Sequence, residues 1–135
     1  MKIVVCIKQV PATTAEKRYT SDLRLDRASA ESVINPLDEY AIEQALRLAE
    51  SGAADSVSYM SMGPEQAGEA LRRALAMGGD EAYLVSDPAL AGADEWATAV
   101  VLAAALALLL MAPFAIRLLA EGSRPLRVTR EEQPA

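Results

Sequence analysis

Residues 56–87 read SVSYMSMGPEQAGEALRRALAMGGDEAYLVSD, and this stretch decides the fold of the chain. Apolar segments at residues 56–61 and 82–86 predict two short strands, because each is bounded by turn residues and is too short for a helix. Between them, residues 65–77 carry small and apolar side chains at helical spacing, and a pair of glycines follows at residues 78–79. The inward-facing set of this helix is Ala67, Ala70, Leu71, Ala74 and Leu75. A strand, a helix and a second strand in this order predict a crossover between two parallel strands.

A further strand is predicted at the amino terminus. Residues 2–10 form a nearly continuous apolar run rich in Val and Ile, which is typical of a strand buried on both faces, and Pro11 ends it. The next segment, residues 12–32, is polar and charged with short alternation. It predicts a small hairpin that turns at Ser21 and Asp22.

A helix is predicted to open at Asn35, which is a good N-cap residue, while Pro36 suits the first helical position. Asp38 and Glu39 favour this end because the amino-terminal end of a helix dipole is positive. The apolar stripe predicted to face the core is Leu37, Ala41, Ala45 and Leu48. Gly52 ends the helix.

The order strand–helix–strand–helix–strand contains two crossover units. The predicted class is therefore α/β, with a parallel sheet and helices on both faces. In sheets of this kind, ligands bind at the carboxyl ends of the strands. Those ends are Val10, Met62–Gly63 and Ser86–Asp87, and we expect them to form the rim of a binding site.

The composition excludes several classes of function. The chain has 135 residues, which favours one domain, and a net charge of −6, which disfavours a nucleic-acid-binding surface. It has no His, which is the commonest metal ligand and the commonest general base at neutral pH. A single Cys excludes an intramolecular disulfide and a Cys-based zinc site. The first residues run directly into a strand pattern without the features of a signal peptide, so we expect a cytoplasmic protein.

One segment permits two interpretations. Residues 96–116 are 21 residues without a charge, long enough at about 1.5 Å per residue to cross a bilayer. The alternative is a third helix of a soluble domain, begun by Asp94 and Glu95, buried or poorly packed, and interrupted at Pro113. We favour the soluble helix because 8 of the 20 residues at 97–116 are Ala, which contributes little to membrane insertion.

Several positions near the strand ends are candidates for binding, and each has a simpler structural explanation. Residues 62–64, Met-Gly-Pro, precede a helix and either present backbone N–H groups to an anion or form a strand-to-helix turn. Asn35 is already explained by its N-cap role. Cys6 lies within the first strand and is interpreted as a buried apolar residue, because nothing nearby lowers the pKa of its thiol. Lys8 either faces an anion or lies at a sheet edge.

Four strings, taken together and in order, are more specific than any single motif. They are MKIVVCIKQVP, SVINPLDEYAIEQALRL, SMGPEQAGEALRRALAMGGDEAYLVSD and LAGADEWATA, and they span about residues 1–105. In order and spacing they resemble the β subunit of electron transfer flavoproteins. The resemblance implies a Rossmann-like, adenine-nucleotide-binding α/β domain that pairs with a larger α subunit.

The same resemblance implies a function. In that family the heterodimer holds one FAD, mostly through the α subunit, and an AMP within the β subunit. This chain would then be an electron carrier subunit without a catalytic acid or base of its own, and so not an enzyme. The implied partners are the α subunit, acyl-CoA or other flavin dehydrogenases as donors, and a quinone oxidoreductase as acceptor. The resemblance gives no reason to expect a nucleic acid or a membrane as partner.

The resemblance also carries the AMP-binding positions of the family onto six residues of this chain. They are Cys6, Asn35, Pro36, Leu37, Asp38 and Met62. Asn35 is expected to hydrogen-bond the nucleotide, and the backbone around Met62 is expected to lie close to the adenine or ribose. No catalytic residue and no metal ligand is implied.

The chain departs from the family in its carboxyl-terminal part. Family members are considerably longer, and the Gly-containing loop that supplies most of their AMP phosphate contacts has no counterpart here. We therefore predict an electron transfer flavoprotein β-subunit-like domain at residues 1–110, incomplete relative to the family, and a divergent tail at residues 111–135. The alternative function is a non-redox nucleotide-binding module, or a structural remnant of the same fold without electron-transfer activity.

Overall fold

The computed structural model describes residues 1–23, 25–27 and 29–122, with residues 114–122 described as helical backbone only. It divides into two compact units, Met1–Thr98 and Ala99–Ala135, each of which is considered by itself. The last part of the predicted tail, residues 123–135, lies outside the described residues. The predicted boundary after residue 110 stays a prediction.

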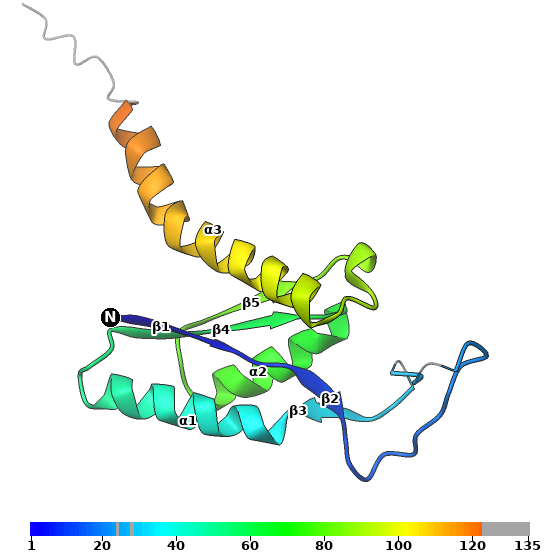
Figure 1. The fold of residues 1–135 in the computed structure, drawn as a ribbon. Coiled ribbons are helices and arrows are strands. Elements are labelled where there is room, and N and C mark those ends of the chain that lie inside the picture. The colour runs from blue at the N-terminus through cyan, green and yellow to red at the C-terminus, as the bar shows by residue number, and fades with distance from the viewer. Residues whose placement is uncertain (24, 28, 123–135) are drawn as a thin grey trace, which may run out of the picture. The chain divides into compact units, whose positions relative to one another are not determined.

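The first unit is built on a three-stranded parallel sheet (Figure 1). Its strands are β1 (Lys2–Cys6), β4 (Ser56–Met62) and β5 (Glu81–Val85), in the spatial order β1-β4-β5. Two helices, α1 (Pro36–Glu50) and α2 (Gly68–Met77), make the crossovers between successive strands. The predicted α/β class with a parallel sheet is confirmed.

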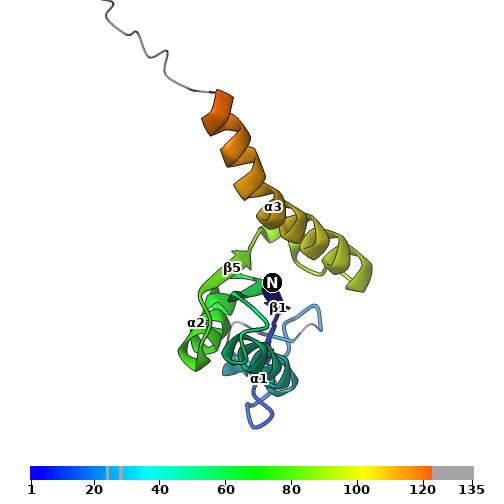
Figure 2. The same ribbon diagram turned by 90° about the vertical axis from the view of Figure 1, so that its left-hand side faces the viewer.

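Both crossover helices of this unit lie on one face of the sheet (Figures 1 and 2). The strand order advances in a single direction, and right-handed crossovers then place successive helices on the same side. One core cluster accordingly joins residues of α1, α2 and the strands, with Ile42, Tyr59 and Ala74 completely buried. Burying an aliphatic side chain of this size contributes about 1.5–3 kcal/mol.

The predicted single strand at residues 2–10 is wrong, because the chain divides it between two sheets. Ile7 N–H donates to the carbonyl of Met60 at 2.8 Å, which is the last bond to the parallel sheet. The chain then turns away, and β2 (Gln9–Pro11) pairs antiparallel with β3 (Ser32–Ile34). An apolar run contains no signal for the point at which its pairing partner changes.

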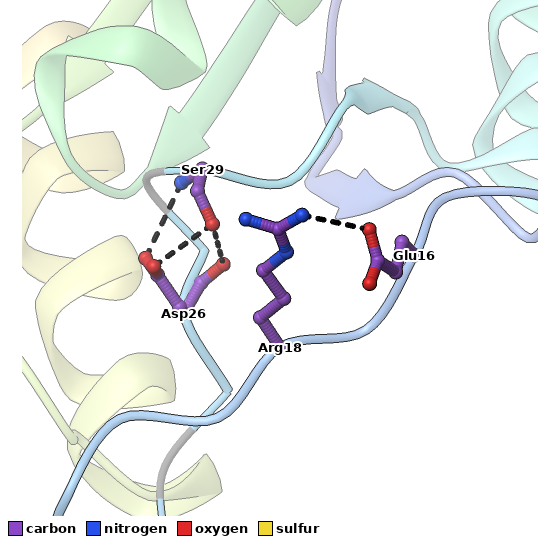
Figure 3. Close-up of polar contacts among 4 residues, drawn as sticks. All are labelled: Glu16, Arg18, Asp26 and Ser29. Atoms are coloured by element: carbon purple, nitrogen blue, oxygen red, sulfur yellow. Dashed lines mark hydrogen bonds and ion pairs between the residues drawn. The ribbon is translucent and has the colours of Figure 1, made fainter.

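The segment between β2 and β3 contains the predicted hairpin. Tyr19 and Leu25 form an isolated antiparallel bridge, and Leu23 N–H donates to the carbonyl of Thr20 at 3.0 Å, so the turn is centred on residues 21–22 as predicted. Beyond the bridge, the Asp26 carboxylate accepts bonds from the Ser29 N–H at 3.3 Å and from its hydroxyl at 2.8 Å (Figure 3). Local polar contacts of this kind hold the segment.

Helix α1 presents a different face to the core from the one predicted. Of the predicted stripe only Ala45 is buried, whereas Leu37 is 72% exposed and Leu48 is 36% exposed. The residues that pack inward are Ile42, Ala45, Leu46 and Ala49. The predicted end of the helix is confirmed, because Gly52 follows with a φ of +78°.

Helix α2 agrees more closely with its pattern. The predicted segment begins as a short 3-10 turn, Glu65–Ala67, before the α-helix starts. Four of the five residues expected to face inward are buried, and only Leu75 is exposed, at 36%. Gly78 and Gly79 end the helix with φ values of 143° and 91°, as predicted.

Helix α3 (Glu95–Gly122) continues through Pro113, so the predicted interruption at that residue is wrong. Its segment Glu95–Pro113 has a mean hydropathy of 2.2, which by length and composition is sufficient to cross a membrane. None of this segment is buried, so the predicted burial of the helix is also wrong.

Candidate functional site

The carboxyl end of β1 meets the amino-terminal end of α1, as the topology predicts. Cys6 is the last residue of β1, and the backbone N–H of Lys8 just beyond it donates to Oδ2 of Asp38 at 2.8 Å. Asn35 N–H donates to the carbonyl of Lys8 at 2.9 Å. Three of the predicted residues, Cys6, Asn35 and Asp38, are therefore brought together by backbone contacts rather than by side chains alone.

The side chain of Asn35 does not cap the helix, so the prediction that capping fully explains this residue is wrong. Asn35 occupies the N-cap position, but its side chain accepts no bond from the first turn. Its Nδ2 instead donates to Oδ1 of Asp38 at 2.8 Å. The Asp38 carboxylate thus accepts bonds from both sides, and it holds the Asn35 amide at the strand end.

Cys6 is exposed, which corrects its interpretation as a buried apolar residue. The pKa of its thiol is raised, first by partial burial and second by the nearby negative charge of Asp38. A raised pKa keeps the thiol protonated at neutral pH and makes it a poor nucleophile. The expectation that Cys6 is not a reactive thiol agrees with this environment.

Met62 lies two residues beyond Met60, the residue opposite Cys6 in the sheet, and lines a small cavity of about 120 Å³. The N–H of Gly63 donates to the carbonyl of Val85 at 3.0 Å, so it is not available to an anion. The strand-to-helix turn therefore explains residues 62–64. The wall of the cavity includes Gln9, Pro11, Arg27, Ser32 and Gln66 in addition to these residues.

Two residues of this cavity were not predicted. Gln9 Nε2 donates to the carbonyl of Gln66 at 3.1 Å, which links β2 to the turn before α2. Gln66 Nε2 in turn donates to the carbonyl of Arg27 at 3.4 Å. The only signal in the sequence is that Gln9 is a polar residue near the end of an apolar run.

The remaining predicted residues lie at the surface. Pro36 is the first residue of α1 and is exposed, and Leu37 beside it is 72% exposed. The site thus consists of a polar group at the end of β1, formed by Asn35 and Asp38 beside Cys6, and a separate cavity lined by Met62. Within the described residues, no group of three or more His, Cys, Asp or Glu side chains is placed to hold a metal ion.

This arrangement favours one type of ligand group. A carboxylate accepts hydrogen bonds from hydroxyl and amino groups, and an amide both donates and accepts them. A phosphate would meet the like charge of Asp38. The strand end is therefore suited to the sugar and base of a nucleotide rather than to its phosphate.

Comparison with known proteins gives the ancestry of the chain. The model of the electron transfer flavoprotein domain matches residues 22–124. The chain belongs to the electron transfer flavoprotein family. It is 48% identical over 104 residues to the caffeyl-CoA reductase–Etf complex subunit CarD of Acetobacterium woodii, a match covering 77% of this chain and 40% of the relative.

Other relatives in the electron transfer flavoprotein family give the same result. The chain is 49% identical over 106 residues to the electron transfer flavoprotein subunit beta of Thermoanaerobacterium thermosaccharolyticum, covering 78% of the chain and 40% of the relative. It is 43% identical over 106 residues to the subunit beta of Megasphaera elsdenii, covering 78% of the chain and 39% of the relative. The resemblance to β subunits is confirmed, and the chain spans about two-fifths of the length of these relatives.

Replacing Asp38 by asparagine is expected to lower the pKa of the Cys6 thiol, because the variant removes a nearby negative charge. The new amide keeps an oxygen that accepts the Lys8 N–H. Partial burial remains, so the pKa falls only part of the way toward its usual value. The measurement is the pH dependence of Cys6 alkylation by iodoacetamide, whose midpoint is expected to move to lower pH.

The matched control is Glu50→Gln, which removes one negative charge at the opposite end of α1. It is expected to leave the alkylation midpoint unchanged. Equal midpoints for Asp38→Asn and the unsubstituted protein would show that the carboxylate does not act on the thiol.

Proposed function

We propose that the chain acts in electron transfer as the β, or small, subunit of an α/β electron transfer flavoprotein. Its family membership supports the proposal, and so does the position of Asn35 and Asp38 at the carboxyl end of β1. These two side chains occupy positions that the family uses for AMP. The observation that carries the proposal is this polar group at the strand end, within a chain 43–49% identical to named β subunits.

AMP in this proposal is a structural nucleotide held at the end of β1. The Asp38 carboxylate would accept a ribose hydroxyl or the adenine amino group, and Asn35 would donate or accept a neighbouring bond. The backbone near Met62 would face the same nucleoside. Cys6, Pro36 and Leu37 would complete the strand end around it.

The FAD is proposed to be held mainly by the α subunit, where its flavin supplies the electron-transfer chemistry. The β subunit would contribute a docking surface and the bound AMP, and no acid or base catalyst. Acyl-CoA or other flavin dehydrogenases are the proposed donors, a quinone oxidoreductase is the proposed acceptor, and the cytoplasm is the proposed location. The name of one relative, a caffeyl-CoA reductase–Etf complex subunit, concerns a complex with a reductase acting on a CoA thioester.

The test is native mass spectrometry of this chain co-expressed with an electron transfer flavoprotein α subunit. A 1:1 complex carrying FAD and AMP is the expected result. A complex with AMP but without FAD would support the alternative, a non-redox nucleotide-binding module. No complex and no nucleotide would leave a structural remnant of the fold and overturn the proposal.

A substitution at the strand end tests the AMP site itself. Asn35→Ala is expected to weaken AMP binding about fivefold, the effect of one lost hydrogen bond. The measurement is the AMP occupancy of the purified complex at a series of free AMP concentrations. Gln44→Ala, on the exposed side of α1, is the matched control and is expected to leave the occupancy unchanged. Equal occupancy for the two variants would exclude Asn35 from the site.

A further inference from the structure

Strand β3 has one open edge whose backbone groups have no partner. The bonds Ala12 N–H to Glu31 carbonyl and Asn35 N–H to Lys8 carbonyl, 2.8 and 2.9 Å, define which residues of β3 face β2. Bonded and non-bonded residues alternate along an antiparallel strand, so Val33 faces β2 and its neighbours face away. Those neighbours are Ser32 and Ile34. In the described part of the chain, no hydrogen bond reaches their outward N–H and C=O groups.

Lack of partners is unusual at this position because the edge is not simply in solvent. Ile34 is only 2% exposed. Buried backbone groups are nearly always paired, and an unpaired one costs about 1–3 kcal/mol. An edge strand with such groups is a template for another strand.

A groove of about 470 Å³ runs along this edge, a volume within the range of about 300–1,000 Å³ typical of ligand sites. Ser32, Val33 and Ile34 form one wall, and Ala70 with its neighbours on α2 forms the other. The groove therefore offers a strand edge on one side and the surface of a helix on the other.

The charged residues of the groove come from α2. The guanidinium of Arg72 is bound to the carboxylate of Glu69, which neutralises both. Arg73 also lines the groove, is exposed, and forms no ion pair in the described structure. The groove therefore has one uncompensated positive charge in a chain whose net charge is −6.

We propose that this groove binds an extended segment of a partner polypeptide, which adds as a strand to the open edge of β3 and places an acidic side chain against Arg73. The added strand would donate to and accept from Ser32 and Ile34, as in other cases of strand addition. Main-chain bonds supply the affinity, and the contact with Arg73 supplies the selectivity.

Two other occupants fit less well. A small anion would satisfy the N–H groups and Arg73 but would leave the two outward carbonyls of Ser32 and Ile34 unpaired. A second copy of the chain, pairing β3 with β3, would bring two uncompensated Arg73 side chains into one interface. An extended acidic segment matches both the donors and the acceptors of the edge as well as its charge.

The test uses the full chain, labelled with ¹⁵N, and the peptide acetyl-Val-Glu-Val-Glu-Val-amide as probe. The amide resonances of Ser32 and Ile34 are expected to shift on titration, and that of Val33 to shift less. Arg73→Glu is expected to weaken binding at least about fivefold. Lys2→Glu, the same charge change on an exposed residue outside the groove, is the matched control and is expected to bind as before.

Three results would overturn the proposal. The first is the absence of shifts at Ser32 and Ile34, or equal binding of a peptide with Lys in place of Glu. The second is a shift of the same amides by inorganic phosphate alone, which would assign the groove to a small anion. The third is self-association in sedimentation that protects these amides without peptide, which would assign the edge to a second copy.

Discussion

Replacing Gly79 by alanine is expected to lower the free energy of unfolding of the Met1–Thr98 unit by about 2–5 kcal/mol. Gly79 has a φ of +91°, which L side chains rarely adopt, and an added Cβ would lie 2.8 Å from Cε2 and from Oη of Tyr59. Tyr59 is completely buried, and its hydroxyl donates to the carbonyl of Gly78 at 2.9 Å. The ring cannot move away without breaking this bond, so strain and overpacking both act.

The same chain provides the control for the strain alone. Gly52 has a similar φ of +78°, and an added Cβ there would have no atom within 4 Å. Gly52→Ala is expected to cost about 1 kcal/mol, from the backbone conformation only. The measurement is the urea midpoint of the two variants at equal slope. Similar midpoints for the two variants would contradict the proposed contact between position 79 and the tyrosine ring.

The end of α2 shows what the sequence can and cannot predict. A pair of glycines after an apolar helix predicts its end, and the structure confirms it. That Gly79 also makes room for Tyr59 depends on the return of the chain 20 residues later, where Asp80 and Val57 exchange two bonds of 2.8 Å. A contact of this kind joins two elements, and no local pattern contains it.

The candidate site was predicted to a similar extent. Parallel topology alone places the ends of β1 and β4 on one rim, and the family resemblance chose Asn35 and Asp38 there. Neither could show that the Asn35 amide binds Asp38 instead of capping the helix. The second sheet was missed because β2 continues the apolar run of β1, and only its pairing with a distant strand separates the two.

The orientation of α1 has a physical cause that the stripe of apolar residues hides. Asp38 is held at the end of β1 by the backbone N–H of Lys8, so this side of the helix must face the sheet. Positions four, seven and eleven residues after Asp38 lie on the same side, and these are Ile42, Ala45 and Ala49. Leu37 is one residue earlier and is rotated toward solvent. The helix is thus oriented by one polar contact at its start.

Ile42→Ala is therefore expected to lower the free energy of unfolding by about 2–5 kcal/mol, because Ile42 is completely buried in the cluster that joins α1 to the strands. Leu37→Ala, which removes a side chain of similar size from the same helix, is expected to change the free energy of unfolding by no more than about 0.5 kcal/mol. Urea unfolding of the two variants measures the difference directly. If Leu37→Ala destabilised the protein as much as Ile42→Ala, the helix would present its predicted stripe to the core. Asp38 would then face away from β1, and the polar group at the strand end, on which the proposed nucleotide site depends, would not form.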